Sequence, residues 1–120
     1  MPVKKILVVD DSPTERFFTV DLLTKAGYEV ITAENGEEGI AKAKSDKPDL
    51  VLMDVVMPGL NGYQATRTLT RDEATKHIPI IVCTSKGQKT DRIWGLRQGA
   101  LDYIVKPVNG EDLLSKIAAL

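Results

Sequence analysis

The chain has 120 residues, of which 42% are apolar and 28% charged, a composition typical of one globular domain with its own core. Lys and Arg total 16 against 17 Asp and Glu, so the net charge of −1 gives no electrostatic reason to expect binding to nucleic acid or insertion into an anionic membrane. The only cysteine, Cys83, excludes a disulfide within one chain and favours a reducing, cytoplasmic compartment.

Short runs of branched apolar residues alternate along the chain with segments of helical character. The predicted strands are Ile6–Val9, Val30–Ala33, Leu50–Met53, Ile78–Cys83 and Tyr103–Val105. The predicted helices open at Ser12, Glu34, Gly62, Lys89 and Gly110, on the basis of capping residues, early acids and helical spacing. Helices between successive strands imply parallel crossovers, and strands that are apolar throughout imply a sheet covered on both faces. The sequence therefore predicts a three-layer α/β domain with a parallel five-stranded sheet over residues 1–120.

Polar side chains stand at the ends of four predicted strands. Asp10 and Asp11 follow the first strand, Asp54 the third, Thr84 the fourth and Lys106 the fifth. Ligands of open parallel sheets bind beyond the carboxyl ends of the strands, so we expect all five groups to share one edge of the sheet.

Three neighbouring carboxylates repel one another, and buried ionised groups need compensation, so this edge predicts a bound cation. Mg²⁺ prefers oxygen ligands, and the absence of His or Cys beside these acids argues against zinc. A carboxylate at Asp54 beside a metal, the hydroxyl of Thr84 and the ammonium of Lys106 is equipped to attack a phosphoryl group.

These residues, in this order, resemble the receiver domain of two-component response regulators over essentially the whole chain. The resemblance implies a CheY-like, flavodoxin-like fold with strand order 2-1-3-4-5. The longer motifs DDSPTE, AENGEEG, MDVVMPGLNGYQATR and DYIVKPV are similar to those of stand-alone regulators in chemotaxis-type pathways that control type IV pili and twitching motility.

The resemblance also implies roles for the acidic residues. Asp54 would accept a phosphoryl group from a histidine kinase of the CheA type. Asp11 would bind Mg²⁺ with help from Asp10, and the backbone carbonyl of Val56 would be a further ligand. Val56 is apolar where the family often has a polar side chain, and Lys86 is basic, so we expect both to alter the hydrolysis rate of the acyl phosphate.

The same resemblance implies a switch. Lys106 would bond to the phosphoryl oxygens, and Thr84 would swing toward them. Tyr103 matches an aromatic position that turns inward with this movement, although an aromatic residue in a strand is more often simple packing. The result would be a population shift on the face formed by the fourth helix, the fifth strand and the fifth helix, where a downstream protein would bind. Trp94 on that helix is either an exposed anchor for a partner or part of the core. A cis Lys106–Pro107 peptide bond is also implied.

Other functions share parts of this pattern. Phosphatases of the haloacid dehalogenase type need a second aspartate two residues after the nucleophile, where this chain has Val56. A flavin-binding domain would need a phosphate loop where Asp10 and Asp11 would repel an anion. A receiver fold that binds partners without phosphorylation stays open, as does a role as a phosphate sink for a shared kinase.

Because the chain stops near the end of the fifth helix, we expect no attached output domain and no enzymatic activity beyond slow self-catalysed phosphotransfer and dephosphorylation.

Overall fold

Five parallel strands form one sheet in the computed structural model, which describes residues 3–55, 59–84, 93 and 96–120. The strands are β1 (Lys5–Val9), β2 (Glu29–Ala33), β3 (Leu50–Asp54), β4 (Ile80–Thr84) and β5 (Asp102–Val105). Their spatial order is β2-β1-β3-β4-β5, which confirms the predicted fold. In the register of the sheet, Val9 lies opposite Met53, Asp54 opposite Cys83, and Thr84 opposite Val105. The carboxyl ends of β1, β3, β4 and β5 therefore lie at one edge.

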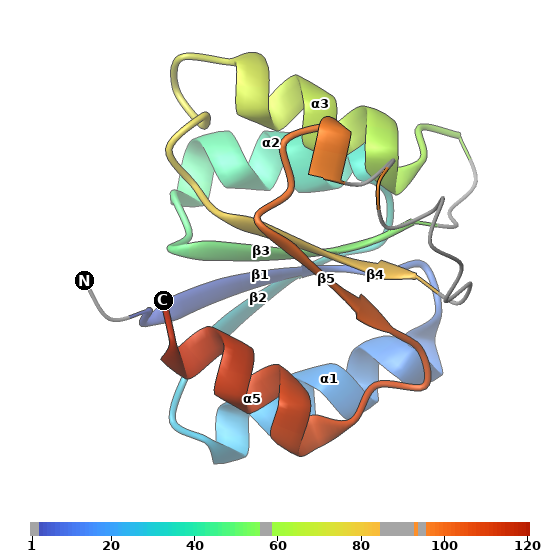
Figure 1. Cartoon of the computed structure of the whole chain (residues 1–120), viewed down its shortest axis with the longest axis vertical. Coiled ribbons are helices and arrows are strands. Elements are labelled where there is room, and N and C mark those ends of the chain that lie inside the picture. Colours follow the sequence, from blue (N-terminus) through green and yellow to red (C-terminus); the bar gives the residue numbers. More distant parts are fainter. Residues whose placement is uncertain (1–2, 56–58, 85–92, 94–95) are drawn as a thin grey trace.

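Helices cover both faces of this sheet, as Figure 1 shows. They are α1 (Pro13–Lys25), α2 (Gly36–Asp46), α3 (Gly62–Arg71) and α5 (Gly110–Ala118). α2 and α3 lie on one face, and α1 and α5 lie on the other. In the predicted fourth helix, Ile93, Leu96 and Arg97 are helical, while Trp94 and most of its neighbours lie outside the described residues.

Each of these four helices begins after a polar residue that caps it. The side chains of Ser12, Asn35, Asn61 and Asn109 each accept a hydrogen bond from the backbone N–H three residues further along. Such caps satisfy N–H groups that have no partner within the helix, and they fix where the helix starts. The helices after β1, β3 and β5 consequently begin close to the edge that carries the predicted site.

The core has two layers because successive residues of a strand point to opposite faces. Leu7 and Val9 belong to the cluster that includes residues of α2 and α3, whereas Ile6 and Val8 belong to the cluster that includes residues of α1 and α5. All five residues of β3 and all five of β4 are buried, as the continuous apolar runs predict.

The fourth strand begins later than the sequence predicts. β4 begins at Ile80 instead of Ile78, and the intervening Pro79 has no N–H to donate to a strand ladder. In α1, Leu23 is buried, whereas Phe17 is 74% exposed and Phe18 51% exposed. No helix in the described part of the chain is long and apolar enough to span a bilayer.

Candidate functional site

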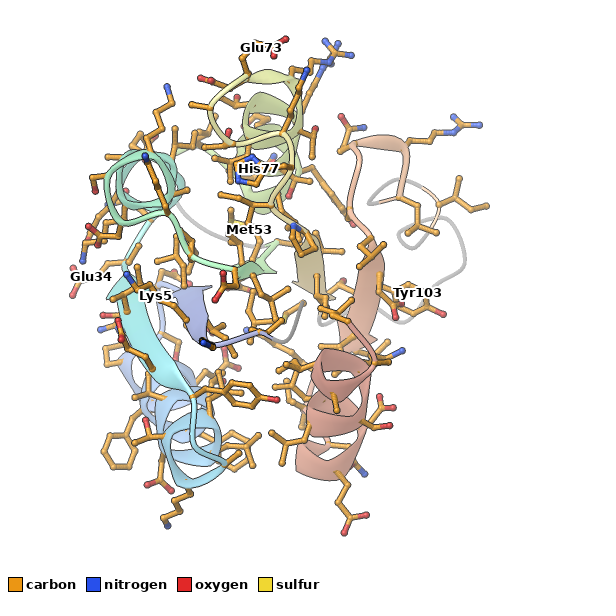
Figure 2. All side chains as sticks on the ribbon, turned by 90° about the vertical axis from the view of Figure 1, so that its left-hand side faces the viewer. Lys5, Glu34, Met53, Glu73, His77 and Tyr103 are labelled. Carbon is orange, nitrogen blue, oxygen red and sulfur yellow. The ribbon has the colours of Figure 1, made fainter. Side chains whose placement is uncertain are left out.

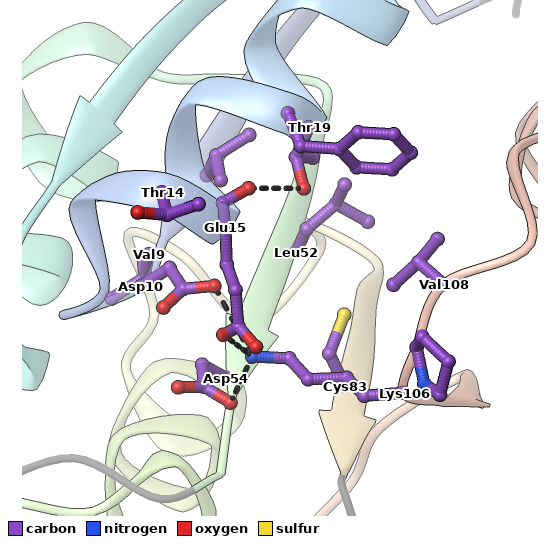
Figure 3. A pocket seen from close by; sticks show the side chains of 13 residues that line it. Val9, Asp10, Thr14, Glu15, Thr19, Leu52, Asp54, Cys83, Lys106 and Val108 are labelled. Atoms are coloured by element: carbon purple, nitrogen blue, oxygen red, sulfur yellow. Dashed lines mark hydrogen bonds and ion pairs between the residues drawn. The ribbon is translucent and has the colours of Figure 1, made fainter.

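Asp54 ends β3, and its side chain lies in a pocket at the carboxyl edge of the sheet (Figure 3). The residue is only 5% exposed. Beyond the end of β3, the N–H of Val55 donates one more hydrogen bond to β4, to the carbonyl of Cys83 at 3.0 Å. The first residue of α3, Gly62, then donates its N–H to the carbonyl of Val55 at 3.0 Å. This contact brings α3 directly against the end of β3 and fixes the backbone of Asp54.

Asp10 is the second buried acid of the site, at 5% exposure. Its Oδ1 accepts the N–H of Ser12 at 2.9 Å, and its own N–H donates to the carbonyl of Ala33 at 3.1 Å. The guanidinium of Arg16 donates to the carbonyl of Asp10 at 2.6 Å. Asp11, in contrast, is exposed. The segment after β1 is thus held by bonds from both neighbouring elements, with one acid buried and the next facing water.

The ammonium of Lys106 lies among three carboxylates, as Figure 3 shows. Its Nζ is 3.0 Å from Oδ1 of Asp54, 3.2 Å from Oδ2 of Asp10 and 2.5 Å from Oε2 of Glu15. The side chain of Lys106 is 12% exposed. Its backbone N–H donates to the carbonyl of Thr84 at 2.7 Å, so the end of β4 positions the lysine across from the acids.

Burial and the neighbouring charged groups act on the pKa values of Asp54 and Lys106. Burial raises the pKa of Asp54 to about 6, against the lowering effect of Lys106, and the charges of Asp10 and Asp11 raise it further. Burial lowers the pKa of Lys106, but its hydrogen bonds to Glu15 and Asp54 outweigh this effect and leave the pKa above its ordinary value. One ammonium therefore does not fully compensate the acids around it, and the site favours additional positive charge.

The donor set fits a hard divalent cation. Asp10, Glu15 and Asp54 each offer a carboxylate oxygen, and these oxygens all lie within 4.8 Å of one another. Oxygen ligands of this kind are those that Mg²⁺ prefers. Glu15 was missed in the sequence, where it reads only as an acid in the first turn of a helix. Asp11, which the resemblance favours as the main metal ligand, is exposed and does not belong to this group of converging carboxylates.

The remaining predicted residues lie on the neighbouring strands or outside the described part of the chain. Thr84 ends β4 and is buried, at 3% exposure. Tyr103 lies opposite Val82 on the edge strand β5 (Figure 2), half-buried against the core layer that includes residues of α2 and α3. The Lys106–Pro107 bond is cis, as the resemblance implies. Val56 and Lys86 lie outside the described residues.

A pocket of about 320 Å³ extends from this cluster between α1 and the segment that follows β5. Besides the site residues, it is lined mainly by apolar side chains, and Phe18, Leu52, Cys83 and Val108 are among them. The thiol of Cys83 is buried, and desolvation raises its pKa to about 12.

Cys83 is accordingly expected to resist alkylation in the folded chain. The thiolate is the reactive form, so reaction with iodoacetamide at pH 7.5 should be about a hundredfold or more slower in native protein than in urea-unfolded protein. Mass spectrometry at timed intervals measures both rates. Similar rates for the two states would contradict the burial and protonation described for this thiol.

Sequence comparison places the chain in a family. Residues 6–118 match the response regulator receiver domain, and the chain belongs to this family. Protein PilH of Pseudomonas aeruginosa is 57% identical over 116 residues, which cover 97% of this chain and 96% of PilH. Several longer curated relatives also match, and the chain spans between 26% and 51% of their lengths.

Solved structures agree with this assignment. The chemotaxis protein CheY4 of Vibrio cholerae has a TM-score of 0.90 and 35% identity, with 96% of each chain covered. The receiver domain of a sensor histidine kinase from Pseudomonas aeruginosa has a TM-score of 0.88 and 31% identity, with 96% of this chain and 94% of that one covered. In that relative, a magnesium ion is coordinated in the active site cleft.

Proposed function

We propose that this chain is a phosphorylation-dependent response regulator in which Asp54 accepts a phosphoryl group from a histidine kinase. The observation that carries the proposal is the ion pair of 3.0 Å between Lys106 and the buried carboxylate of Asp54. A fixed ammonium beside a carboxylate supplies both the nucleophile and the positive charge that phosphoryl transfer needs. Membership of the receiver domain family over residues 6–118 supports it independently.

In the proposed reaction, a carboxylate oxygen of Asp54 forms a bond to phosphorus, and the bond from phosphorus to the imidazole nitrogen of the kinase histidine breaks. We assign the attack to Oδ2, because Oδ1 is engaged by Lys106. Lys106 then balances charge on the phosphoryl oxygens, and the hydroxyl of Thr84 donates to one of them.

Asp10, Asp11, Asp54 and the backbone carbonyl of Val56 are the residues proposed to hold Mg²⁺. The bound ion supplies positive charge to the phosphoryl oxygens. The converging carboxylates of Asp10, Glu15 and Asp54 support the parts of this assignment that concern Asp10 and Asp54. We propose no other catalytic activity for the chain, apart from slow self-catalysed loss of the phosphoryl group.

We further propose that the pathway is chemotaxis-like and controls type IV pili and twitching motility, with a CheA-like kinase as donor and a cytoplasmic location. The 57% identity to PilH supports this choice. Output would pass to a protein that binds the face of the fourth helix, β5 and α5, through coupled movement of Thr84 and Tyr103. Neither nucleic acid nor membrane insertion is part of the proposal.

The test is incubation with phosphoramidate and Mg²⁺, followed by intact mass spectrometry. The P–N bond of phosphoramidate breaks, ammonia leaves and a P–O bond to Asp54 forms. Wild-type protein should gain one phosphoryl group, and Asp54→Asn should gain none. Asp21→Asn is the matched control, because Asp21 is an acid of α1 that pairs with Lys25 instead of Lys106.

Removing Mg²⁺ with EDTA should slow the wild-type reaction by about tenfold or more, because the metal stabilises the transferred charge. No mass gain in wild-type protein would favour a receiver fold that binds partners without phosphorylation. A gain that persists in Asp54→Asn would identify a different acceptor. Comparing proteins captured by the phosphorylated and unphosphorylated forms then distinguishes active output, with a form-specific partner, from a phosphate sink.

A further inference from the structure

The three hydrogen-bond donors of Lys106 are matched by three carboxylate partners. An ammonium group has three N–H donors, and Nζ of Lys106 lies within 3.2 Å of oxygens from Asp10, Glu15 and Asp54. The shortest of these distances, 2.5 Å, is to Glu15 of α1, not to either acid at a strand end. A new partner for this ammonium must therefore displace one that is already present.

Glu15 is the partner that is easiest to displace. Its side chain is 50% exposed, whereas those of Asp10 and Asp54 are each 7% exposed. Its backbone is fixed, because its N–H donates to the Ser12 hydroxyl at 3.3 Å and its carbonyl accepts the Thr19 hydroxyl at 3.1 Å. Movement is therefore confined to the side chain, whose carboxylate regains water when it leaves the lysine.

The carboxylate of Glu15 also lies next to the place where a phosphoryl group would attach. One of its oxygens is within 4.8 Å of an oxygen of Asp54. A phosphoryl group brings a charge of about −1.5 to −2 near pH 7, and like charges at this separation repel strongly where water is partly excluded. Glu15 therefore opposes the phosphoryl group in two ways. It occupies the ammonium of Lys106, and its negative charge repels the phosphoryl oxygens.

We propose that Glu15 is a positioning residue that holds Lys106 in the unphosphorylated chain and opposes phosphorylation of Asp54. Its carboxylate must release the ammonium and turn outward before Lys106 bonds to the phosphoryl oxygens. The charge of Glu15 thereby sets how readily the chain becomes phosphorylated. This inference rests on the phosphoacceptor function proposed for Asp54.

The experiment compares Glu15→Gln with Asp21→Asn, each of which removes one negative charge from α1. The Asp21 side chain is 47% exposed, close to the 50% of Glu15. With phosphoramidate and saturating Mg²⁺, Glu15→Gln should be phosphorylated about 3- to 10-fold faster than wild type, and Asp21→Asn should match wild type. Glu15 is paired with Lys106 and is not among the residues proposed to hold the ion, so calorimetric titration should give Mg²⁺ dissociation constants within about twofold of wild type for both variants.

Two outcomes would overturn the inference while leaving the proposed function intact. Equal phosphorylation rates for Glu15→Gln and Asp21→Asn would show that Glu15 does not oppose the reaction. Slower phosphorylation of Glu15→Gln together with Mg²⁺ binding weakened about tenfold would make Glu15 part of the metal site.

A second measurement applies even if wild-type protein takes up no phosphoryl group, a result that would instead remove the proposed function. In metal-free buffer, Glu15→Gln should lower the folding equilibrium constant about threefold or more when Lys106 is present. It should not lower it in a Lys106→Met background, where Glu15 has no ammonium to hold. Equal effects in the two backgrounds would rule out the anchoring role.

Discussion

Replacing Gly62 with alanine is expected to lower the free energy of unfolding by about 3 kcal/mol or more, because the added methyl group has no space. A Cβ at this position would lie 2.0 Å from the carbonyl oxygen of Asp54 and 2.8 Å from Cα of Val55. Both are backbone atoms at the end of β3, so relieving the clash requires moving α3 away from the strand.

Gly110→Ala is the matched control. Gly110 is also the first residue of a helix that follows an asparagine cap, so the intrinsic effect of alanine on the helix is the same at both positions. Its added Cβ would lie 3.1 Å from the end of the flexible Leu22 side chain. We expect a loss below about 1 kcal/mol. Urea unfolding followed by circular dichroism measures both variants, and equal losses would contradict the close approach of Gly62 to β3.

The fold illustrates what short-range patterns do and do not specify. β3 and β4 are recognisable because they are apolar throughout, and such runs are typical of strands buried on both faces. The pairing of β1 with both β2 and β3 has no comparable local signal. Many strand orders are compatible with five similar runs, so the order followed from the family resemblance and not from the runs themselves.

The candidate site divides in the same way. Asp10, Asp54 and Lys106 were predictable as neighbours because each stands at the carboxyl end of a strand, and parallel strands bring those ends together. Glu15 was not predictable, because an acid in the first turn of a helix commonly does no more than interact with the helix dipole. Its contact with Lys106 depends on how α1 lies relative to the segment after β5, a tertiary arrangement that spacing does not encode.

Replacing Asp54 with asparagine is expected to stabilise the metal-free chain at neutral pH by roughly 2–3 kcal/mol. The reason is that burial raises the pKa of Asp54 from 3.8 to about 6 in the folded chain. A tenfold change in an acid dissociation constant corresponds to about 1.4 kcal/mol. Between pH 4 and 6 the folded chain retains a proton at Asp54 that the unfolded chain has lost, so the stability of wild-type protein falls as the pH rises through this range. Above it the ionised carboxylate contributes a constant destabilisation, which asparagine removes. Lys106 keeps Asp10 and Glu15 as partners in the variant.

Urea unfolding of wild-type and Asp54→Asn protein in EDTA, at a series of pH values from 4 to 8, measures this difference. The variant should be more stable above pH 6, and its advantage should decline to below about 1 kcal/mol by pH 4, where Asp54 is protonated in the folded chain and is close to its ordinary pKa of 3.8 in the unfolded chain. Adding Mg²⁺ should narrow the gap at pH 7.5, because a cation that binds only the folded site stabilises wild-type protein more than the variant. A variant less stable than wild type at pH 7.5 in EDTA would mean that the ion pair with Lys106 outweighs the desolvation of Asp54, contrary to the raised pKa of this carboxyl group.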